Sequence, residues 1–448
     1  MISRLAPFLR WAYPGLGIKR WLLVAIAGIL LLVNGVDRYL VAIGYNVHAN
    51  EVVDSFIADY FSPSYLSWIF MGLGIAMIFL GIRQWLLAIL RASAVSGGSE
   101  HILDTLYQMR LRNGYKIVAI GGGTGLATLL RGLKRSSTNL TAVVTVSDDG
   151  GSSGRLQKEL GVLPPGDVRN CLVALADDEA MVTDLFRYRF AEGEGLTGHS
   201  FGNLFLAAMT GITGNFDRAI KESSRVLNIK GRVLPSTLGV VRLCARLADN
   251  TTVEGETNIS TSRQPIKQVF FDPPYAAPLS ETIAAIRDAD AIVLGPGSLY
   301  TSILPNFLVD RIAQEVERSQ AVKMYVCNVM TQPGETDNMT AADHVSALLE
   351  NAGRRVCDYV IVNDEPPSKL LEAYAVEGQL PVKPDVERIR AMGLTPIRSQ
   401  MISETATVRH DSEKLAQVVI GVIDRAVAQR AAYMRPAQVY EQRSNSPA

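Results

Sequence analysis

From residue 115 onward, short apolar runs alternate with longer segments that have a helical spacing of apolar residues. The runs typical of buried strands are 116–120, 140–146, 291–294, 324–327 and 359–362. Apolar residues three and four positions apart, typical of helices, occur at 126–133, 181–190 and 202–210. Strands that are apolar along their whole length indicate a sheet covered on both faces. The pattern predicts an α/β fold with three layers and a mainly parallel sheet over 115–430.

Other segments depart from this alternation. Residues 251–271 are more polar and β-branched, which predicts an antiparallel insertion. Residues 93–114 are expected to form a linker followed by a lead-in helix, and residues 431–448 a disordered tail.

The first 92 residues contain two long apolar stretches, at about 21–43 and 65–90. Each is long enough to cross a bilayer as a helix, and a second span argues against a cleavable signal peptide. Tryptophans near their ends suit the membrane interface. The stretches predict a two-helix transmembrane hairpin as a membrane anchor, with a buried hairpin of soluble helices as the alternative.

The basic residues predict the orientation of that hairpin. They flank the two stretches on the outer sides, at Arg4, Arg10, Lys19, Arg20, Arg83 and Arg91. The connecting segment, 44–64, contains Glu51, Asp54 and Asp59 but no lysine or arginine. The positive-inside rule therefore places both termini and the main domain in the cytoplasm, beside the lipid bilayer.

Composition narrows the function classes. The 448 residues contain 44 Lys plus Arg and 44 Asp plus Glu, so overall charge gives no argument for nucleic acid as a partner. The four cysteines are scattered without CxxC spacing, at Cys171, Cys244, Cys327 and Cys357. This spacing argues against a metal cage or a disulfide framework and fits a reducing compartment.

A strand, a glycine turn and a helix follow one another at 116–130. The turn consists of Gly121, Gly122, Gly123, Thr124 and Gly125. Backbone without side chains lets amides approach an anion at a helix N-terminus. The spacing matches neither GxGxxG nor a Walker motif. The turn predicts a site for a nucleotide or phosphorylated ligand, and a tight turn without a ligand is the alternative.

The loop after the second strand reads SDDGGSSG from Ser147. Its carboxylates, with Ser152 nearby, are candidates for holding hydrated Mg²⁺ or a sugar hydroxyl, at Asp148 and Asp149. Consecutive side chains diverge, so both are not expected on one ion. An Asp-Gly turn with a helix cap is the alternative.

Two further segments place polar side chains at helix starts. PPGDVRN from Pro164 brings Asp167, Arg169 and Asn170 within one turn, and the arginine is suited to bidentate pairing with phosphate. His199 and Asn203 are four residues apart, which predicts one shared helix face. Ordinary capping and packing are the alternatives for both segments.

Two later loops repeat the pattern of a strand followed by polar groups. The first offers Gly295, Gly297, Ser298, Thr301 and Ser302. The second begins at Cys327 and offers Asn328 and Thr331. Because strand ends of a parallel sheet meet at one edge, these loops predict a single shared cleft.

These motifs together resemble the CofD/YvcK-like superfamily, and within it the bacterial gluconeogenesis-factor branch. The ordered strings are GGGTG, SDDGGSSG, PPGDVRN, HSFGN, GPGSLYTSILPN, CNVMTQPGETD and VRHD, which span about 116–426. The resemblance implies a Rossmann-like fold that binds a nucleotide-sugar such as UDP-N-acetylglucosamine. It also implies a role in cell shape and envelope-precursor supply during gluconeogenic growth. The membrane hairpin is a departure from the usual soluble members.

The resemblance also implies residue roles. Cleft-lining positions carried over are the glycine turn, Asp148, Asp167, Asn203, the 295–302 loop, Asn328 and Arg409. Arg409 is expected to pair with a diphosphate, and Tyr374 to stack on a uracil, with helix packing as the alternative for Tyr374. A related branch transfers a phospholactyl group to a deazaflavin, with aspartates matching Asp148 or Asp149 and Asp167 near the metal.

Three function hypotheses follow. The first is a membrane-tethered, non-catalytic regulator that senses a UDP-sugar and acts on a protein partner, because no nucleophile–base pair is apparent. The second is a transferase that uses Mg²⁺ at Asp148 and Asp167. The third, a nicotinamide-dependent oxidoreductase, is disfavoured by the glycine spacing. A homodimer is left open.

Overall fold

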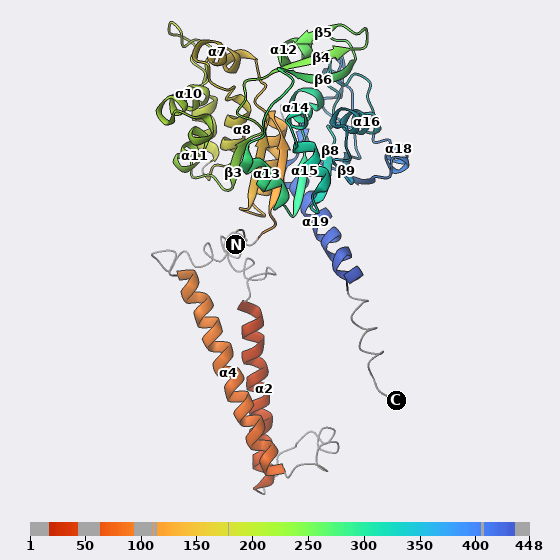
Figure 1. The fold of residues 1–448 in the computed structure, drawn as a ribbon. Coiled ribbons are helices and arrows are strands. Elements are labelled where there is room, and N and C mark those ends of the chain that lie inside the picture. The colour runs from red at the N-terminus through yellow and green to blue at the C-terminus, as the bar shows by residue number, and fades with distance from the viewer. Residues whose placement is uncertain are drawn as a thin grey trace. The chain divides into compact units, whose positions relative to one another are not determined.

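The computed structural model describes residues 18–43, 63–93, 111, 114–177, 179–404 and 407–434. The chain divides into two compact units, Met1–Arg112 and Asn113–Ala448 (Figure 1). Most of the predicted linker and lead-in helix lies outside the described residues. Helix α19 (Ser412–Met434) continues four residues into the predicted tail, whose remainder also lies outside them.

The N-terminal unit is a pair of helices, α2 (Ile18–Ala42) and α4 (Pro63–Ser93). Glycines form their contact: a Cβ on Gly28 would lie 2.9 Å from the Gly74 carbonyl oxygen, and Gly35 and Gly81 are similarly close to the other helix. Large apolar side chains face outward, with Leu30 66% and Phe79 70% exposed. Both helices are long and apolar enough to be candidate membrane spans.

The second unit is built on a seven-stranded sheet in the order β10-β9-β8-β7-β1-β2-β3, in which every neighbouring pair is parallel. Its strands are β1 (Ile117–Gly121), β2 (Leu140–Val144), β3 (Arg232–Pro235), β7 (Ala291–Leu294), β8 (Val322–Val326), β9 (Tyr359–Asn363) and β10 (Thr395–Ser399). The predicted parallel sheet is confirmed, although the sequence pattern missed the two edge strands, β3 and β10.

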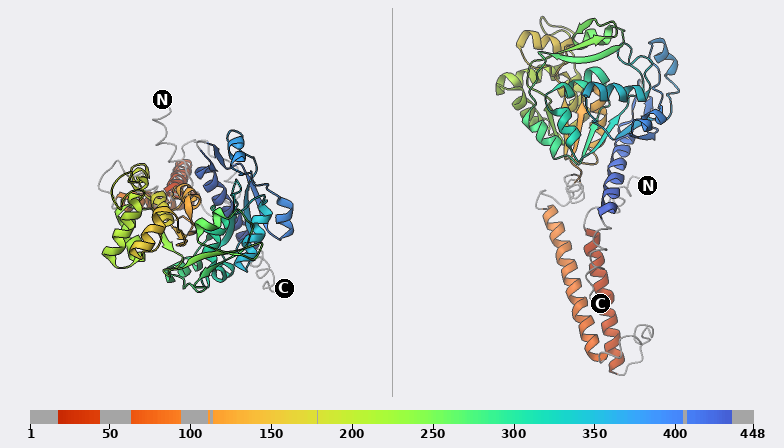
Figure 2. Two further views of the ribbon diagram at one scale, coloured as in Figure 1. Left: turned by 90° about the horizontal axis from the view of Figure 1, so that it is seen from above. Right: turned by 45° about the vertical axis from the view of Figure 1, so that its right-hand side comes forward.

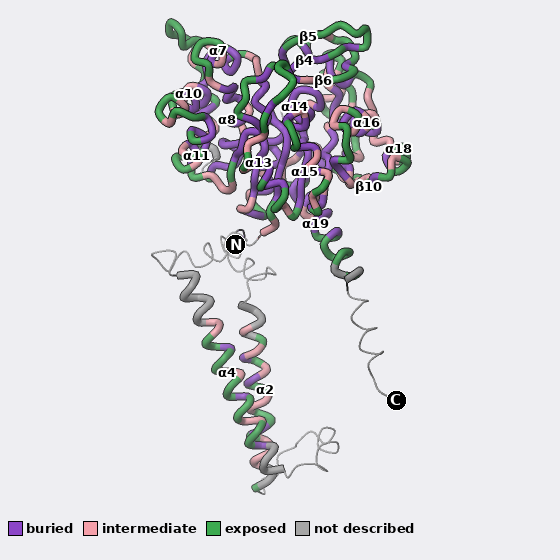
Figure 3. Tube along the Cα trace, viewed as in Figure 1, coloured by how far each residue is buried: buried purple, intermediate pink, exposed green. Residues whose placement is uncertain are grey.

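Helices cover both faces of this sheet, as the views in Figure 2 show. Alternate side chains of β1 enter opposite layers, because strand residues point to opposite faces. Ile117 and Ala119 pack with α6 (Gly123–Leu133), α8 (Gly166–Leu175) and α19. Val118 and Ile120 pack with the other layer, which contains α13 (Ser280–Arg287), α14 (Leu304–Leu308), α15 (Ile312–Arg318), α16 (Ala341–Ala352) and α18 (Val386–Ala391). The central strands are buried throughout (Figure 3).

The remaining elements lie around this core. The predicted antiparallel insertion is confirmed as a sheet in the order β5-β4-β6, and it starts earlier than expected, at Arg242. It consists of β4 (Arg242–Leu247), β5 (Thr252–Glu254), α12 (Glu256–Thr261) and β6 (Ile266–Asp272). The others are α7 (Gly151–Leu160), α9 (Glu179–Arg187), α10 (Phe201–Thr213), α11 (Phe216–Val226), α17 (Leu371–Val376) and the hairpin of β11 (Ile402–Glu404) with β12 (Val408–His410).

Candidate functional site

The two glycine loops meet where β1 and β7 end. The Gly295 amide donates to the Ile120 carbonyl at 2.8 Å, so the loops leave the sheet side by side. A Cβ on Gly125 would overlap the Pro296 carbonyl oxygen, so this position requires glycine. The buried Asn306 amide on α14 also donates to the Gly121 carbonyl at 3.2 Å. The predicted convergence of these two loops is confirmed.

The first turn is not wholly open to a ligand. Helix α6 begins at Gly123, whose φ is +65°, and no side chain caps it from Gly122. The Asp167 carboxylate accepts a hydrogen bond from the Gly123 amide. Its Oδ2 also fills the space in which a Gly122 Cβ would lie. The Gly123 amide is therefore used within the protein by Asp167.

Asp148 lies close to Gly166, the residue that precedes Asp167. Asp148 accepts from the Gly150 amide at 2.9 Å, and its Oδ2 occupies the space beside Gly166. Burial and the Asp148 charge raise the pKa of Asp167 to about 7, against the opposing effects of the Gly123 amide and Arg169. Two neighbouring carboxylates fit Mg²⁺, which is often held by one or two carboxylates plus water. No group of three metal-ligating side chains occurs in the described part of the chain.

Asp149 diverges from Asp148, as adjacent side chains were expected to do. It accepts hydrogen bonds from the Thr257 amide at 3.0 Å and the Thr257 hydroxyl at 2.9 Å. These contacts cap the first turn of α12 from a distant loop. Asp149 therefore supports the insertion, which is closer to the capping alternative than to a ligand-binding role.

His199 and Asn203 both reach α7, but not from one helix face. Helix α10 begins at Phe201 with Ser200 as its cap, so His199 lies outside the helix, contrary to expectation. The His199 Nδ1 lies 3.0 Å from the Ser152 hydroxyl, and burial lowers the pKa of His199. The Asn203 side-chain amide donates to the Ser153 hydroxyl at 3.3 Å. These contacts fasten α7 to α10.

A pocket lined by arginines lies along one side of α6, from Thr124 in its first turn to Arg131 in its last. Its guanidinium groups belong to Arg131, Arg169, Arg187 and Arg409, which we call the arginine pocket, and its lining includes Thr124 and Asn170. Sequence reasoning missed Arg131 and Arg187. The helical spacing from Thr124 through Thr128 to Arg131 would have revealed the first; the second had no such signal. The pocket is small, 20 Å³, but no other described cavity combines these cations with the glycine turn.

Arg169 is the most fixed member of this pocket. It donates to the Ser200 hydroxyl at 2.7 Å, to Asn203 Oδ1 at 3.0 Å and to Asn170 Oδ1 at 3.0 Å. All three acceptors are neutral. Burial and the nearby Arg189 charge lower the pKa of Arg169, whereas the Asp148 and Asp167 charges oppose that shift. An anionic ligand would supply the charge that these acceptors lack.

Several predicted residues of the loops after β7 and β8 join these two loops by hydrogen bonds. Asn328 accepts from the Gly297 amide at 3.3 Å, and Ser298 accepts from the Gln332 side chain at 2.8 Å. Thr301 is 1% exposed and donates to Glu335 at 3.0 Å. The Ser302 side chain is also buried. Sequence reasoning missed Gln332 and Glu335 as parts of this site. Their roles depend on hydrogen bonds to Ser298 and Thr301, which lie 34 positions away in the sequence.

Thr331 and Tyr374 have partners of their own. The Thr331 hydroxyl accepts from the Leu380 amide at 2.9 Å. The Tyr374 hydroxyl accepts from the Val408 amide at 2.9 Å, next to the exposed Arg409. Tyr374 thus holds β12 in place, which favours the packing alternative for its ring.

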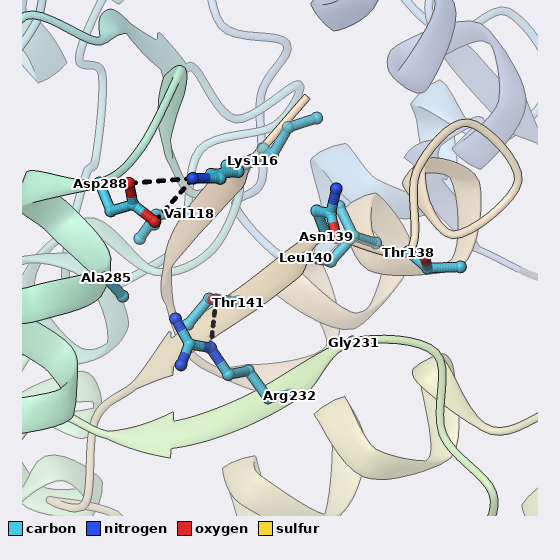
Figure 4. A pocket seen from close by; sticks show the side chains of 11 residues that line it. Lys116, Val118, Thr138, Asn139, Leu140, Thr141, Gly231, Arg232, Ala285 and Asp288 are labelled. Carbon is cyan, nitrogen blue, oxygen red and sulfur yellow. Dashed lines mark hydrogen bonds and ion pairs between the residues drawn. The ribbon is translucent and has the colours of Figure 1, made fainter. Parts of the chain in front are cut away.

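A larger cavity of 340 Å³ lies at the opposite edge of the sheet, at the amino ends of β1, β2 and β3 (Figure 4). Lys116 pairs with Asp288 at 2.9 Å, and Arg232 donates to Thr141 at 2.8 Å. Ligands of open α/β sheets bind at the carboxyl ends of strands. We therefore place the candidate site at the smaller pocket, where the chemistry converges.

Comparison with known proteins gives concordant results. The family model of 2-phospho-L-lactate transferase CofD matches residues 117–402. The gluconeogenesis factor of Bacillus subtilis (strain 168) is 52% identical over 310 residues, covering 69% of this chain and 98% of that protein. A crystal structure of a UPF0052-family protein from Bacillus halodurans has a TM-score of 0.66 and 47% identity, covering 68% of this chain and 99% of the other.

A relative from Nostoc sp. (strain PCC 7120) is named as a gluconeogenesis factor on a provisional basis. It is 46% identical over 424 residues, which is 93% of each chain. A match of that extent reaches into the N-terminal apolar segments. The N-terminal unit, which looked like a departure from the family, is therefore shared in part with a relative.

Proposed function

Because the chain belongs to the CofD family, among relatives named gluconeogenesis factor, we propose that it is a regulator that binds a nucleotide-sugar such as UDP-N-acetylglucosamine. Its ligand state would control a protein partner in cell-envelope precursor synthesis, and hence cell shape during growth on gluconeogenic carbon. The observation that carries the proposal is the arginine pocket at the N-terminus of α6.

The electrostatics of the pocket favour a diphosphate. Four arginines line one pocket that reaches the first turn of α6 at Thr124, where the helix dipole also favours negative charge. Arginine pairs with phosphate oxygens through two parallel hydrogen bonds. The Gly123 amide already donates a hydrogen bond to Asp167. We therefore place the diphosphate beside Thr124 and the arginines rather than on the Gly123 amide.

Isothermal titration calorimetry on the full chain in detergent tests this proposal. UDP-N-acetylglucosamine and UDP are expected to release or absorb measurable heat, and uridine, which lacks the diphosphate, is expected to bind far more weakly. Equal affinity for uridine and UDP would contradict the role of the arginine pocket. Absence of any binding would contradict the proposal as a whole.

A Mg²⁺-dependent transfer of a phosphorus-containing group is the second candidate, favoured by the closeness of Asp148 and Asp167. These two carboxylates would hold the ion, which would neutralise charge on a phosphoryl group. Arg169, two residues beyond Asp167, would orient the donor phosphate. Release of nucleoside monophosphate or diphosphate from a donor, abolished in Asp148→Asn, would favour this candidate.

We also propose that α2 and α4 anchor the chain in a membrane with both termini and the main domain in the cytoplasm. Outward-facing apolar side chains and glycines between the helices support this proposal, since soluble helix pairs bury their large apolar residues. Cysteines placed at residues 54 and 430 test it in intact cells. The first is expected to react with an impermeant maleimide and the second only after lysis.

A further inference from the structure

Helix α12 is held in place by side chains from separate strand-end loops. At its first turn, Asp149 accepts from the amide and hydroxyl of Thr257. At its last turn, the Ser260 hydroxyl donates to Glu335 Oε1 at 2.9 Å, and Thr301 donates to the same oxygen at 3.0 Å. The loops after β2, β7 and β8 therefore fix where the first residue of α12 lies.

That first residue, Glu256, carries a shielded carboxyl oxygen that no described residue pairs with. Its Oε2 is shielded from solvent and accepts no hydrogen bond from the described residues. Burial and then the charges of Asp148 and Asp167 raise the pKa of Glu256 to about 9, and Glu335 and Asp149 add to the effect. All the charges acting on this carboxyl group are thus negative. A buried polar atom without a partner is costly, so a bound group that pairs with it is expected.

A second carboxyl group near Glu256, that of Glu335, also has an oxygen without a hydrogen-bond partner among the described residues. Glu335 is only 5% exposed, and its Oε2 has no hydrogen-bond partner among the described residues. Glu335 belongs to a different loop from Glu256, yet its charge acts on Glu256. Two shielded oxygens from separate elements are therefore left unsatisfied near one another.

The charged residues beyond the strand ends separate into two regions. The arginine pocket attracts phosphate, whereas the carboxylate cluster of Asp148, Asp149, Asp167, Glu256 and Glu335 repels it. The two regions adjoin, because the charges of Asp148 and Asp167 act on Arg169. Hydroxyl groups are neutral and both donate and accept, so they suit carboxyl groups that lack donors.

We propose that Glu256 is a specificity-determining residue that hydrogen-bonds the hydroxyl groups of the ligand's sugar. The arginine pocket holds the diphosphate of the same ligand, so this inference rests on the proposed function. It orients the ligand with its nucleoside diphosphate toward Arg169 and its sugar toward α12. Glu335 contributes the second acceptor.

Paired titrations of the full chain in detergent test the inference, with UDP-N-acetylglucosamine and UDP measured in the presence of EDTA. The quantity compared is the ratio of the two dissociation constants. Glu256→Ala is expected to reduce the preference for the sugar nucleotide about tenfold while leaving the affinity for UDP within about twofold. Glu256→Gln, which keeps donor and acceptor capacity in the same shape, is expected to retain most of the preference. Glu254→Ala is the control, because Glu254 is exposed and pairs with Arg242 at 2.8 Å.

Two results would overturn the inference: an unchanged ratio in Glu256→Ala, whether or not both affinities fall, or a loss of the preference in Glu256→Gln as large as in Glu256→Ala. If Glu256→Ala does not fold, the Glu256→Gln ratio decides alone: a preference retained to within threefold supports the inference and a tenfold loss refutes it. Failure of the unaltered chain to bind UDP at all would instead contradict the proposed function.

Discussion

Replacement of Arg409 by alanine separates ligand binding from folding. The Arg409 side chain is exposed on β12 and makes no hydrogen bond or ion pair with the described residues, yet it lines the arginine pocket. Its loss is therefore expected to leave the thermal midpoint of unfolding unchanged. Surface substitutions without such partners usually alter the free energy of unfolding by less than about 0.5 kcal/mol.

The expected effect on binding is much larger. Hydrogen bonds to charged groups contribute about 1.5–3 kcal/mol, and a value near 2 kcal/mol suits an arginine that remains partly solvated. Since about 1.4 kcal/mol corresponds to a tenfold change in affinity, Arg409→Ala is expected to weaken UDP binding roughly 30-fold. The difference should shrink at high ionic strength, because exposed charges are screened.

Calorimetric titration with UDP, beside a thermal melt of each variant, measures both quantities. Arg318→Ala is the control, because Arg318 is an exposed arginine outside the pocket. Arg169→Gln offers a contrast: it removes a half-buried group with three hydrogen bonds, so both affinity and stability are expected to fall. A dissociation constant for Arg409→Ala within threefold of the unaltered chain would refute the reasoning.

Three further changes address the turn, the carboxylates and the helix pair. Gly125→Ala places a Cβ against the Pro296 carbonyl and is expected to lower the free energy of unfolding by more than about 2 kcal/mol in denaturant titrations, unlike Gly421→Ala, whose Cβ meets open space. The folded-state pKa of Asp167 is about 7 against 3.8, so folding binds a proton between these values and stability falls as pH rises from about 4 to 7, by on the order of 4 kcal/mol. Asp167→Asn should reduce the fall in thermal midpoint between pH 5 and pH 8, part of which remains because the pKa of Glu256 is also raised, and an unchanged slope would contradict the assignment. Gly28→Val should lower disulfide cross-linking between cysteines placed on α2 and α4, whereas Gly72→Val, with no neighbour within 4 Å, should not.

The sequence determined the sheet and the edge at which the site lies. Fully buried strands such as 291–294 have no polar alternation, so their apolar runs are visible without any partner. The glycine turn at 121–125 is equally visible, because its composition meets a local backbone requirement. Edge strand β10 was missed because its sequence, TPIRS, is only half buried and lacks a continuous apolar run.

Only the tertiary structure decided which polar side chains are used within the protein. Asp149 and Thr257 are 108 positions apart, and Thr301 and Glu335 are 34 apart, so nothing local indicates that they pair. Arg187 and Glu256 acquire their significance from charges brought together by distant loops. Local chemistry thus set the strands and the turn. Contacts between remote elements set which carboxylates are capped, which are left unpaired and where the arginines gather, because desolvation and Coulomb energies depend on distance in space.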